Sequence, residues 1–176
     1  MSLQFDKSFK ARALVSEDEV VLEKSAIESG LNLSLTTEII DIFMRHKGPI
    51  VFDQLIEFPA PMSPLSNKNG RMALEIIYGP TTGLWGILTA NRRCAEQIPS
   101  KFVAIGEAPG GNLLLLERES GIVTLWLHDE GDNMSAGAMI AESFRDFLNM
   151  LSIGDMVKAA SRDLGLDEGA LEWKIG

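Results

Sequence analysis

Residues 99–128 read PSKFVAIGEAPGGNLLLLERESGIVTLWLH, and this stretch decides the fold class. It holds three mostly apolar runs, at 102–105, 113–118 and 122–128, each of a length typical of a strand. The loop between the last two runs ends in Gly121, which can supply the positive φ that a short hairpin loop needs. The stretch therefore predicts consecutive strands, with the last two forming an antiparallel hairpin at the centre of a sheet.

Helical patterns lie upstream of these strands. Ser16 and Glu19 match a capping box, and Gly30 is a natural stop, which predicts a helix that begins at Ser16 and ends before Gly30. A second helix follows, because apolar residues recur at i, i+4, i+7 and i+8 before Gly48-Pro49 ends the pattern. These apolar positions are Leu35, Ile39, Ile42 and Phe43. We expect the two helices to form a helical hairpin.

The segments between the second helix and residue 99 are less regular. Residues 50–52 predict a short edge strand, and the prolines that follow indicate a loop up to about residue 71. Residues 72–78 predict a strand that Gly79-Pro80 ends. Residues 85–91 fit either a strand or a helix.

A strong amphipathic pattern follows the strands. Apolar residues recur there at helical spacing: Ile140, Phe144, Phe147, Leu148 and Leu151. Ser143 and Asp146 match a second capping box, which would start this helix late. A last helix is expected near residues 155–164.

Helices at both ends with consecutive strands between them predict an α+β fold. We expect a central antiparallel sheet flanked by the N-terminal helical hairpin and by C-terminal helices. A chain of 176 residues is of the usual size for one domain, so residues 1–176 are expected to form a single domain.

The charge of the chain limits its partners. A net charge of −9 repels the phosphate backbone, so we expect no nucleic-acid partner. Such a surface attracts a basic protein by long-range steering, although many proteins are acidic only for solubility. The chain shows no signal-peptide pattern and no apolar run long enough to span a bilayer. With Cys94 as the single cysteine, we expect a cytoplasmic protein that does not bind a membrane.

The order of motifs along the chain resembles the SUKH superfamily. The resemblance is carried by Tyr78-Gly79, by the block from Pro99 to the Gly-Gly-Asn step at 110–112, by the Gly-Ile-Val-Thr-Leu-Trp-Leu-His-Asp run at 121–129, and by the Ser-Phe-Arg-Asp-Phe-Leu segment at 143–148. It covers about residues 16–152, which implies a family core there and a C-terminal helical extension over 153–176.

The resemblance also implies a function. The superfamily includes fungal cell-wall regulators and many bacterial immunity proteins, so the chain would be a non-enzymatic binding protein. It would neutralise a toxin, of the nuclease or deaminase class, by occluding it. A regulatory protein-interaction module and a small-molecule-binding domain remain as alternatives.

An acidic loop after the last strand is the leading candidate for contact with a basic partner. It contains Asp129, Glu130 and Asp132. Together with His128 these acids suggest a metal cluster, but they lack the spacing of a zinc or EF-hand site, and a solvated turn explains them more simply.

Two further residues are candidates for partner contact. Glu107 lies in the glycine-rich segment 106–111, which lacks the pattern of a phosphate-binding loop. Trp85 is flanked by glycines that can expose it at an interface, although core packing is the favoured explanation. Cys94 follows two arginines but has no histidine partner in the sequence pattern, which favours a structural cysteine. We expect no catalytic residue, metal or cofactor.

Overall fold

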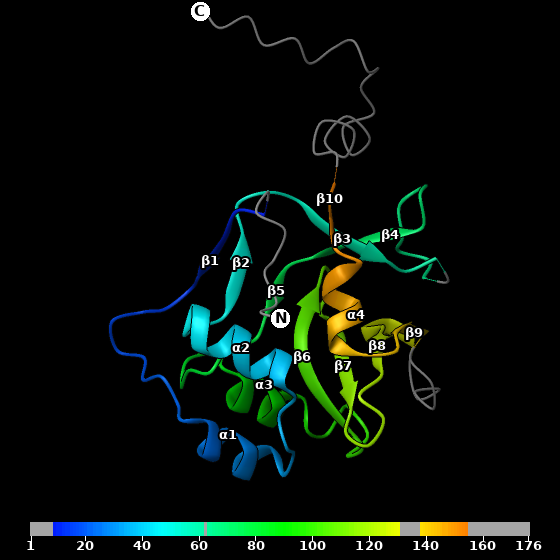
Figure 1. Cartoon of the computed structure of the whole chain (residues 1–176). Helices are drawn as coiled ribbons and strands as arrows, with labels where there is room; N and C mark the ends of the chain where they lie inside the picture. Colours follow the sequence, from blue (N-terminus) through cyan, green and yellow to red (C-terminus); the bar gives the residue numbers. More distant parts are fainter. Residues whose placement is uncertain (1–8, 62, 131–137, 155–176) are drawn as a thin grey trace, which may run out of the picture.

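A computed structural model describes residues 9–61, 63–130 and 138–154 (Figure 1). The described strands form a seven-stranded antiparallel sheet in the order β1-β2-β5-β6-β7-β8-β9 and a three-stranded antiparallel sheet in the order β10-β3-β4. Helices α2 and α4 lie in front of the large sheet in this view. The α+β class is therefore confirmed.

The large sheet contains the predicted hairpin. Its strands are β1 (Ala11–Ala13), β2 (Ile50–Phe52), β5 (Ile76–Ile77), β6 (Phe102–Ala108), β7 (Asn112–Glu117), β8 (Val123–Trp126) and β9 (Ala138–Ala141). β7 and β8 pair from Leu113↔Trp126 to Leu116↔Val123, and Gly121 in their loop has φ +75°. The prediction that residues 50–52 form an edge strand is wrong, because β1 adds one more strand outside β2.

The small sheet comes from a segment that the sequence suggested was a loop. β3 (Ile56–Pro59) pairs with β4 (Arg71–Leu74) on one side and with β10 (Ser152–Ile153) on the other. Pro59 is tolerated because it is the last residue of β3. The strand predicted over 72–78 is divided between the two sheets, since β4 ends at Leu74 and β5 begins at Ile76.

The first helix differs most from its prediction. α1 (Lys24–Leu31) begins eight residues later than expected and ends at Asn32, which has φ 50°. Ser16 and Glu19 instead close a turn, in which the Glu19 N–H donates to the Ser16 carbonyl at 3.1 Å. The next residues are extended, because Val20 and Leu22 hydrogen-bond to Thr82 and Pro80 rather than within a helix.

The other helices agree better with the sequence. α2 (Thr37–His46) buries three of the four predicted apolar positions, and the fourth, Leu35, is buried just before it. α4 (Phe144–Asn149) starts late as predicted, with the Ser143 hydroxyl accepting from the Asp146 N–H at 3.1 Å. Residues 138–141 form β9 instead of extending α4, and the helix expected at 155–164 lies outside the described residues.

Helix α3 (Ile87–Cys94) decides the ambiguous segment and borders the sheet. Its Asn91 donates to the Ala104 carbonyl and accepts from the Ala104 N–H, each at 2.8 Å. This side chain continues the hydrogen-bond ladder of β6 beyond the end of β5. A short 3₁₀ helix, η1 (His128–Glu130), follows β8. None of the helices in the described ranges is long and apolar enough to cross a membrane.

The two sheets share one core. Phe58 of β3 and Phe147 of α4 are fully buried, with their ring centroids 5.8 Å apart. α4 is also joined to α2, because Arg145 pairs with Glu38. The backbone hydrogen bonds of Glu38 are the main cause that lowers its pKa, and Arg145 lowers it further.

Candidate functional site

The glycine-rich turn after β6 is tied to the end of β8 by Asn112. Gly110 and Gly111 have φ +83° and +77°, a conformation that glycine adopts without strain. The Asn112 amide donates to the Pro109 carbonyl, and its oxygen accepts from the His128 N–H at 2.9 Å. Because Asn112 is only 2% exposed, these bonds form away from water and fix where His128 lies.

The acidic loop begins at this fixed point. The His128 ring stacks on Trp126 with a centroid distance of 5.8 Å, and the Asp129 side chain is fully exposed. Glu130 belongs to η1, but its side chain is not among those described, and Asp132 lies outside the described residues. Of the three predicted acids, only Asp129 is thus placed on the surface. Within the described ranges, no group of His, Cys, Asp and Glu is arranged to hold a metal ion.

Glu107 lies in a second cluster on β6. Its Oε1 accepts from the Tyr78 hydroxyl at 2.5 Å and from Arg93 Nη2 at 2.7 Å. The Glu107 side chain is 13% exposed and Tyr78 is 1% exposed. Burial raises the pKa of Tyr78, and the neighbouring Glu107 raises it further. The Glu107 carboxylate therefore stabilises the fold by accepting these two hydrogen bonds, in addition to any contact it makes with a partner.

Trp85 joins the same cluster through Arg93. The guanidinium of Arg93 lies over the Trp85 ring, 5.3 Å from its centroid, and also donates to the Leu84 carbonyl at 3.3 Å. Trp85 is half-buried and packs against the core, whereas the preceding Leu84 is 58% exposed. The structure thus brings two predicted residues, Trp85 and Glu107, together around one arginine.

The two clusters lie on one face of the sheet. Glu107 pairs with Leu113 on β7, and Leu113 pairs with Trp126 on β8. Directly paired residues of antiparallel strands point to the same face. A cross-strand row therefore runs from the Arg93–Glu107 pair to Trp126, on which His128 stacks.

Cys94 also lies near this cluster but is unsuited to nucleophilic chemistry. Its thiol is buried and donates to the Ala90 carbonyl at 2.7 Å. Burial raises the pKa of Cys94, and this effect outweighs the lowering by Arg93. A thiol with a raised pKa carries little of the thiolate form that reacts.

With this geometry established, the chain can be compared with known proteins. The model of the SMI1/KNR4 family (SUKH-1) matches residues 15–150. The chain belongs to the SMI1/KNR4 (SUKH-1) family. Comparisons with curated proteins and with solved structures gave no match. The SUKH resemblance drawn from the sequence is therefore confirmed, and its expected extent of about 16–152 is close to the matched range.

The structure explains three of the SUKH motif segments physically. The Gly-Gly-Asn step and the Trp-x-His run come together because Asn112 bonds both the turn and the His128 backbone. Tyr78-Gly79 places a buried hydroxyl beside Glu107, and Gly79 is needed because a Cβ there would lie 2.1 Å from the Gly48 backbone.

Sequence reasoning missed the central role of Arg93 in this SUKH-1 chain. Arg93 contacts both Trp85 and Glu107, although 14 residues separate it from Glu107 along the chain. A helical assignment of residues 87–94 would have placed Arg93 on a face of α3, but the segment had no decisive periodicity.

Proposed function

We propose that this SUKH-1 protein binds a basic toxin domain, of the nuclease or deaminase class, and neutralises it by occluding its active-site cleft. The observation that carries the proposal is the SUKH-1 match over residues 15–150, in a family whose members act as immunity and regulatory proteins. The role is binding without catalysis, and we place it in the cytoplasm.

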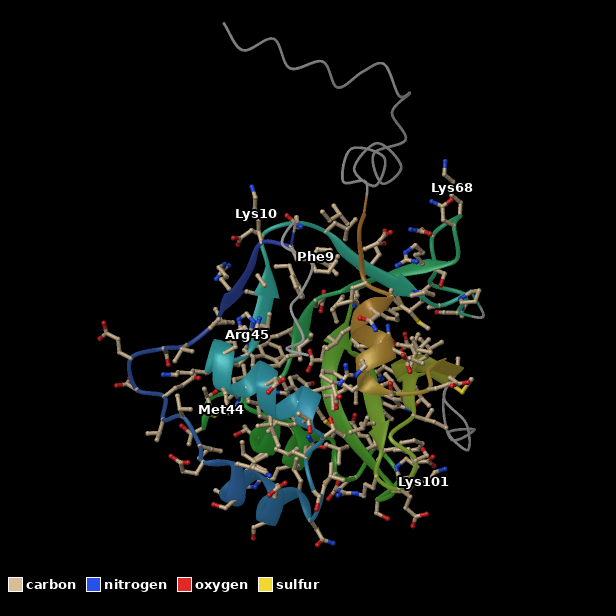
Figure 2. All side chains as sticks on the ribbon, in the orientation of Figure 1. Phe9, Lys10, Met44, Arg45, Lys68 and Lys101 are labelled. Carbon is tan, nitrogen blue, oxygen red and sulfur yellow. The ribbon has the colours of Figure 1, made fainter. Side chains whose placement is uncertain are left out.

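The charge of the molecule supports this choice of partner. The net charge of −9 would speed encounter with a basic protein, which places lysines and arginines around a nucleic-acid substrate. The basic side chains labelled in Figure 2 come from separate parts of the fold, from Lys10 before β1, Arg45 on α2, Lys68 before β4 and Lys101 before β6. These four do not form a continuous basic surface that would oppose a basic partner.

The first experiment is capture of partners from the native host lysate on the full chain, with elution along a salt series. One dominant basic protein, released only by high salt or denaturant, would support the immunity role and identify the toxin. Several weakly held partners would instead favour a regulatory module, and capture of no protein would favour a small-molecule ligand.

The contribution of the acidic loop is tested by the triple variant Asp129→Asn, Glu130→Gln and Asp132→Asn. We expect association with the captured partner to slow by roughly tenfold at low salt and to become less sensitive to salt, because three steering charges are removed. The control variant removes three exposed charges elsewhere, at Glu75, Glu119 and Glu142. An association rate equal to that of the control would remove the loop from the binding site.

A further inference from the structure

The segment 14–22, which we call the strap and which includes the turn closed by Ser16 and Glu19, is hydrogen-bonded to the body of the protein. At its ends, the Leu14 N–H donates to the Pro49 carbonyl at 2.7 Å and the Leu22 N–H to the Pro80 carbonyl at 2.6 Å. In its middle, Val20 accepts from the Thr82 N–H at 3.0 Å and donates to the Thr82 hydroxyl at 3.1 Å. The backbone of the strap is therefore ordered before any partner binds.

Close packing with two glycines adds to this order. A Cβ on Gly83 would lie 2.0 Å from the Glu19 carboxylate carbon, and one on Gly48 would lie 2.3 Å from the Val15 side chain. The strap thus rests directly on the loop 79–86, which carries Leu84 and Trp85.

Despite this anchoring, aliphatic side chains of the strap and of the loop project into water. Val20 is 62% exposed, Val21 is 45% exposed, and Leu84 is 58% exposed. Single exposed aliphatic residues are ordinary, but neighbouring ones on hydrogen-bonded segments indicate an interaction surface. These side chains add little to the core, so their presence on an ordered backbone is better explained by binding.

The charged rim around these side chains is acidic. Glu17 and Asp18 are exposed on the strap and form no salt bridge within the part of the chain that the structure describes. Arg93 is paired with Glu107 at 2.7 Å, and Lys24 with Glu28 at 3.6 Å. Arg92 on α3 is exposed and outside such a pair among the described residues, as is Lys47, which precedes the Gly48 that packs on Val15 at the other end of the strap.

We propose that Val20 and Leu84, rimmed by Glu17 and Asp18, form a docking surface for a basic segment of the partner protein. This segment would insert an apolar side chain between its lysines or arginines. An apolar centre with a charged rim is the usual anatomy of a protein interface, and complementary charge selects the basic partner. The proposal rests on the proposed function, extends it to a surface next to Trp85, and assigns the chemistry of the bound segment.

The same charges argue against two other occupants. An anionic lipid surface would be repelled by Glu17, Asp18 and the net charge of −9. A second copy docking through the same surface around a two-fold axis would bring the acidic rims of both copies together, which is unfavourable.

Amide chemical-shift mapping on the purified full chain tests the surface without the partner. The probe is a synthetic peptide of alternating lysine and leucine, compared with a lysine-only peptide and a serine–leucine peptide. We expect the largest shifts at residues 17–22 and 81–86, only with the lysine–leucine peptide, and weaker at high salt. The proposal would be overturned by equal shifts with the lysine-only peptide, by shifts centred on other residues, or by the absence of shifts. Preferential binding to phosphatidylserine vesicles would indicate a lipid ligand instead, and shifts that depend on protein concentration without peptide would indicate a second copy; either result would also overturn it.

Leu84→Ser then tests the apolar contact, with Leu65→Ser as a matched control, because Leu65 is 57% exposed on the distant β3–β4 loop. We expect Leu84→Ser to weaken binding of the peptide and of the captured partner about tenfold, and Leu65→Ser to leave both unchanged. Equal effects of the two variants would contradict the docking surface.

These results can be separated from failure of the proposed function. If the lysate yields no basic partner, the proposed function fails while the peptide mapping still decides whether the strap binds basic segments. If a basic partner is captured with unchanged affinity by Leu84→Ser, the proposed function stands and the docking surface is refuted.

Discussion

The buried pair formed by Tyr78 and Glu107 gives a quantitative test of how the sheet face is held. Glu107→Ala removes the acceptor of the Tyr78 hydroxyl, which lies 2.5 Å away on a residue that is 1% exposed. An orphaned buried hydroxyl costs about 1–3 kcal/mol. The Arg93 guanidinium, 40% exposed, can return to water, so its lost ion pair adds at most about 1 kcal/mol. We therefore expect Glu107→Ala to reduce the free energy of unfolding by about 1–4 kcal/mol.

A double-mutant cycle isolates the hydroxyl contribution. Tyr78→Phe alone removes one hydrogen bond but leaves Glu107 paired with Arg93, so it should cost about 1 kcal/mol. In the Tyr78→Phe background no hydroxyl is orphaned, and Glu107→Ala should become milder by about 1–2 kcal/mol. Urea unfolding at pH 7, followed by tryptophan fluorescence, measures all four proteins. Effects that add to within about 0.5 kcal/mol would refute the reasoning, because they would mean that the two groups are not coupled.

Two further predictions concern residues beside this pair. Burial raises the pKa of Tyr78 above that of the unfolded chain, so the stability that the protonated hydroxyl contributes is fully present below about pH 10 and is lost as the pH rises above that value. Because Tyr78 is the single tyrosine, we expect absorbance at 295 nm to rise only as the protein unfolds. A gradual titration near pH 10 in the folded protein would contradict this expectation. Asn91→Ala should reduce stability by about 2–4 kcal/mol in thermal melts, because it leaves the buried Ala104 N–H and carbonyl without partners, whereas the exposed neighbour Arg92→Ala should change it by less than about 0.5 kcal/mol. Equal melting temperatures for these two variants would show that water or another group replaces the Asn91 amide.

Some elements could be predicted because their signals are local. The β7–β8 hairpin follows from two apolar runs and the positive φ of Gly121, and the late start of α4 follows from the Ser143 cap. In both cases the residues that decide the structure lie within a few positions of one another. Turn and cap chemistry is then sufficient without tertiary information.

The candidate site could be predicted only in part for the opposite reason. Asp129 is exposed in η1, and Trp85 and Glu107 both contact Arg93, but nothing in the sequence spacing of these residues indicates that Arg93 joins them. Their contact requires α3 to lie beside β6, and that arrangement depends on where β5 ends. Whether any of these residues contacts a partner remains a prediction.

The strap shows how the same local signal can have two outcomes. Ser16 and Glu19 match a helix cap, yet they close a turn, and the following residues extend along Thr82 and Pro80. A helix that begins at Ser16 fits the local sequence, but hydrogen bonds from residues 20–22 to the loop 79–86 replace the bonds that this helix would have made.

The sequence by itself determined the α+β class, the family and the central hairpin, because apolar periodicity, turn glycines and motif order are properties of neighbouring residues. Tertiary structure alone decided the second sheet, the extended strap and the cluster around Arg93. Each of these depends on hydrogen bonds between segments far apart in the chain, such as β3 with β10 and Glu107 with Arg93. Each such bond contributes about 1 kcal/mol, which is similar to the difference in local propensity of one residue, so several of these bonds together outweigh local propensity.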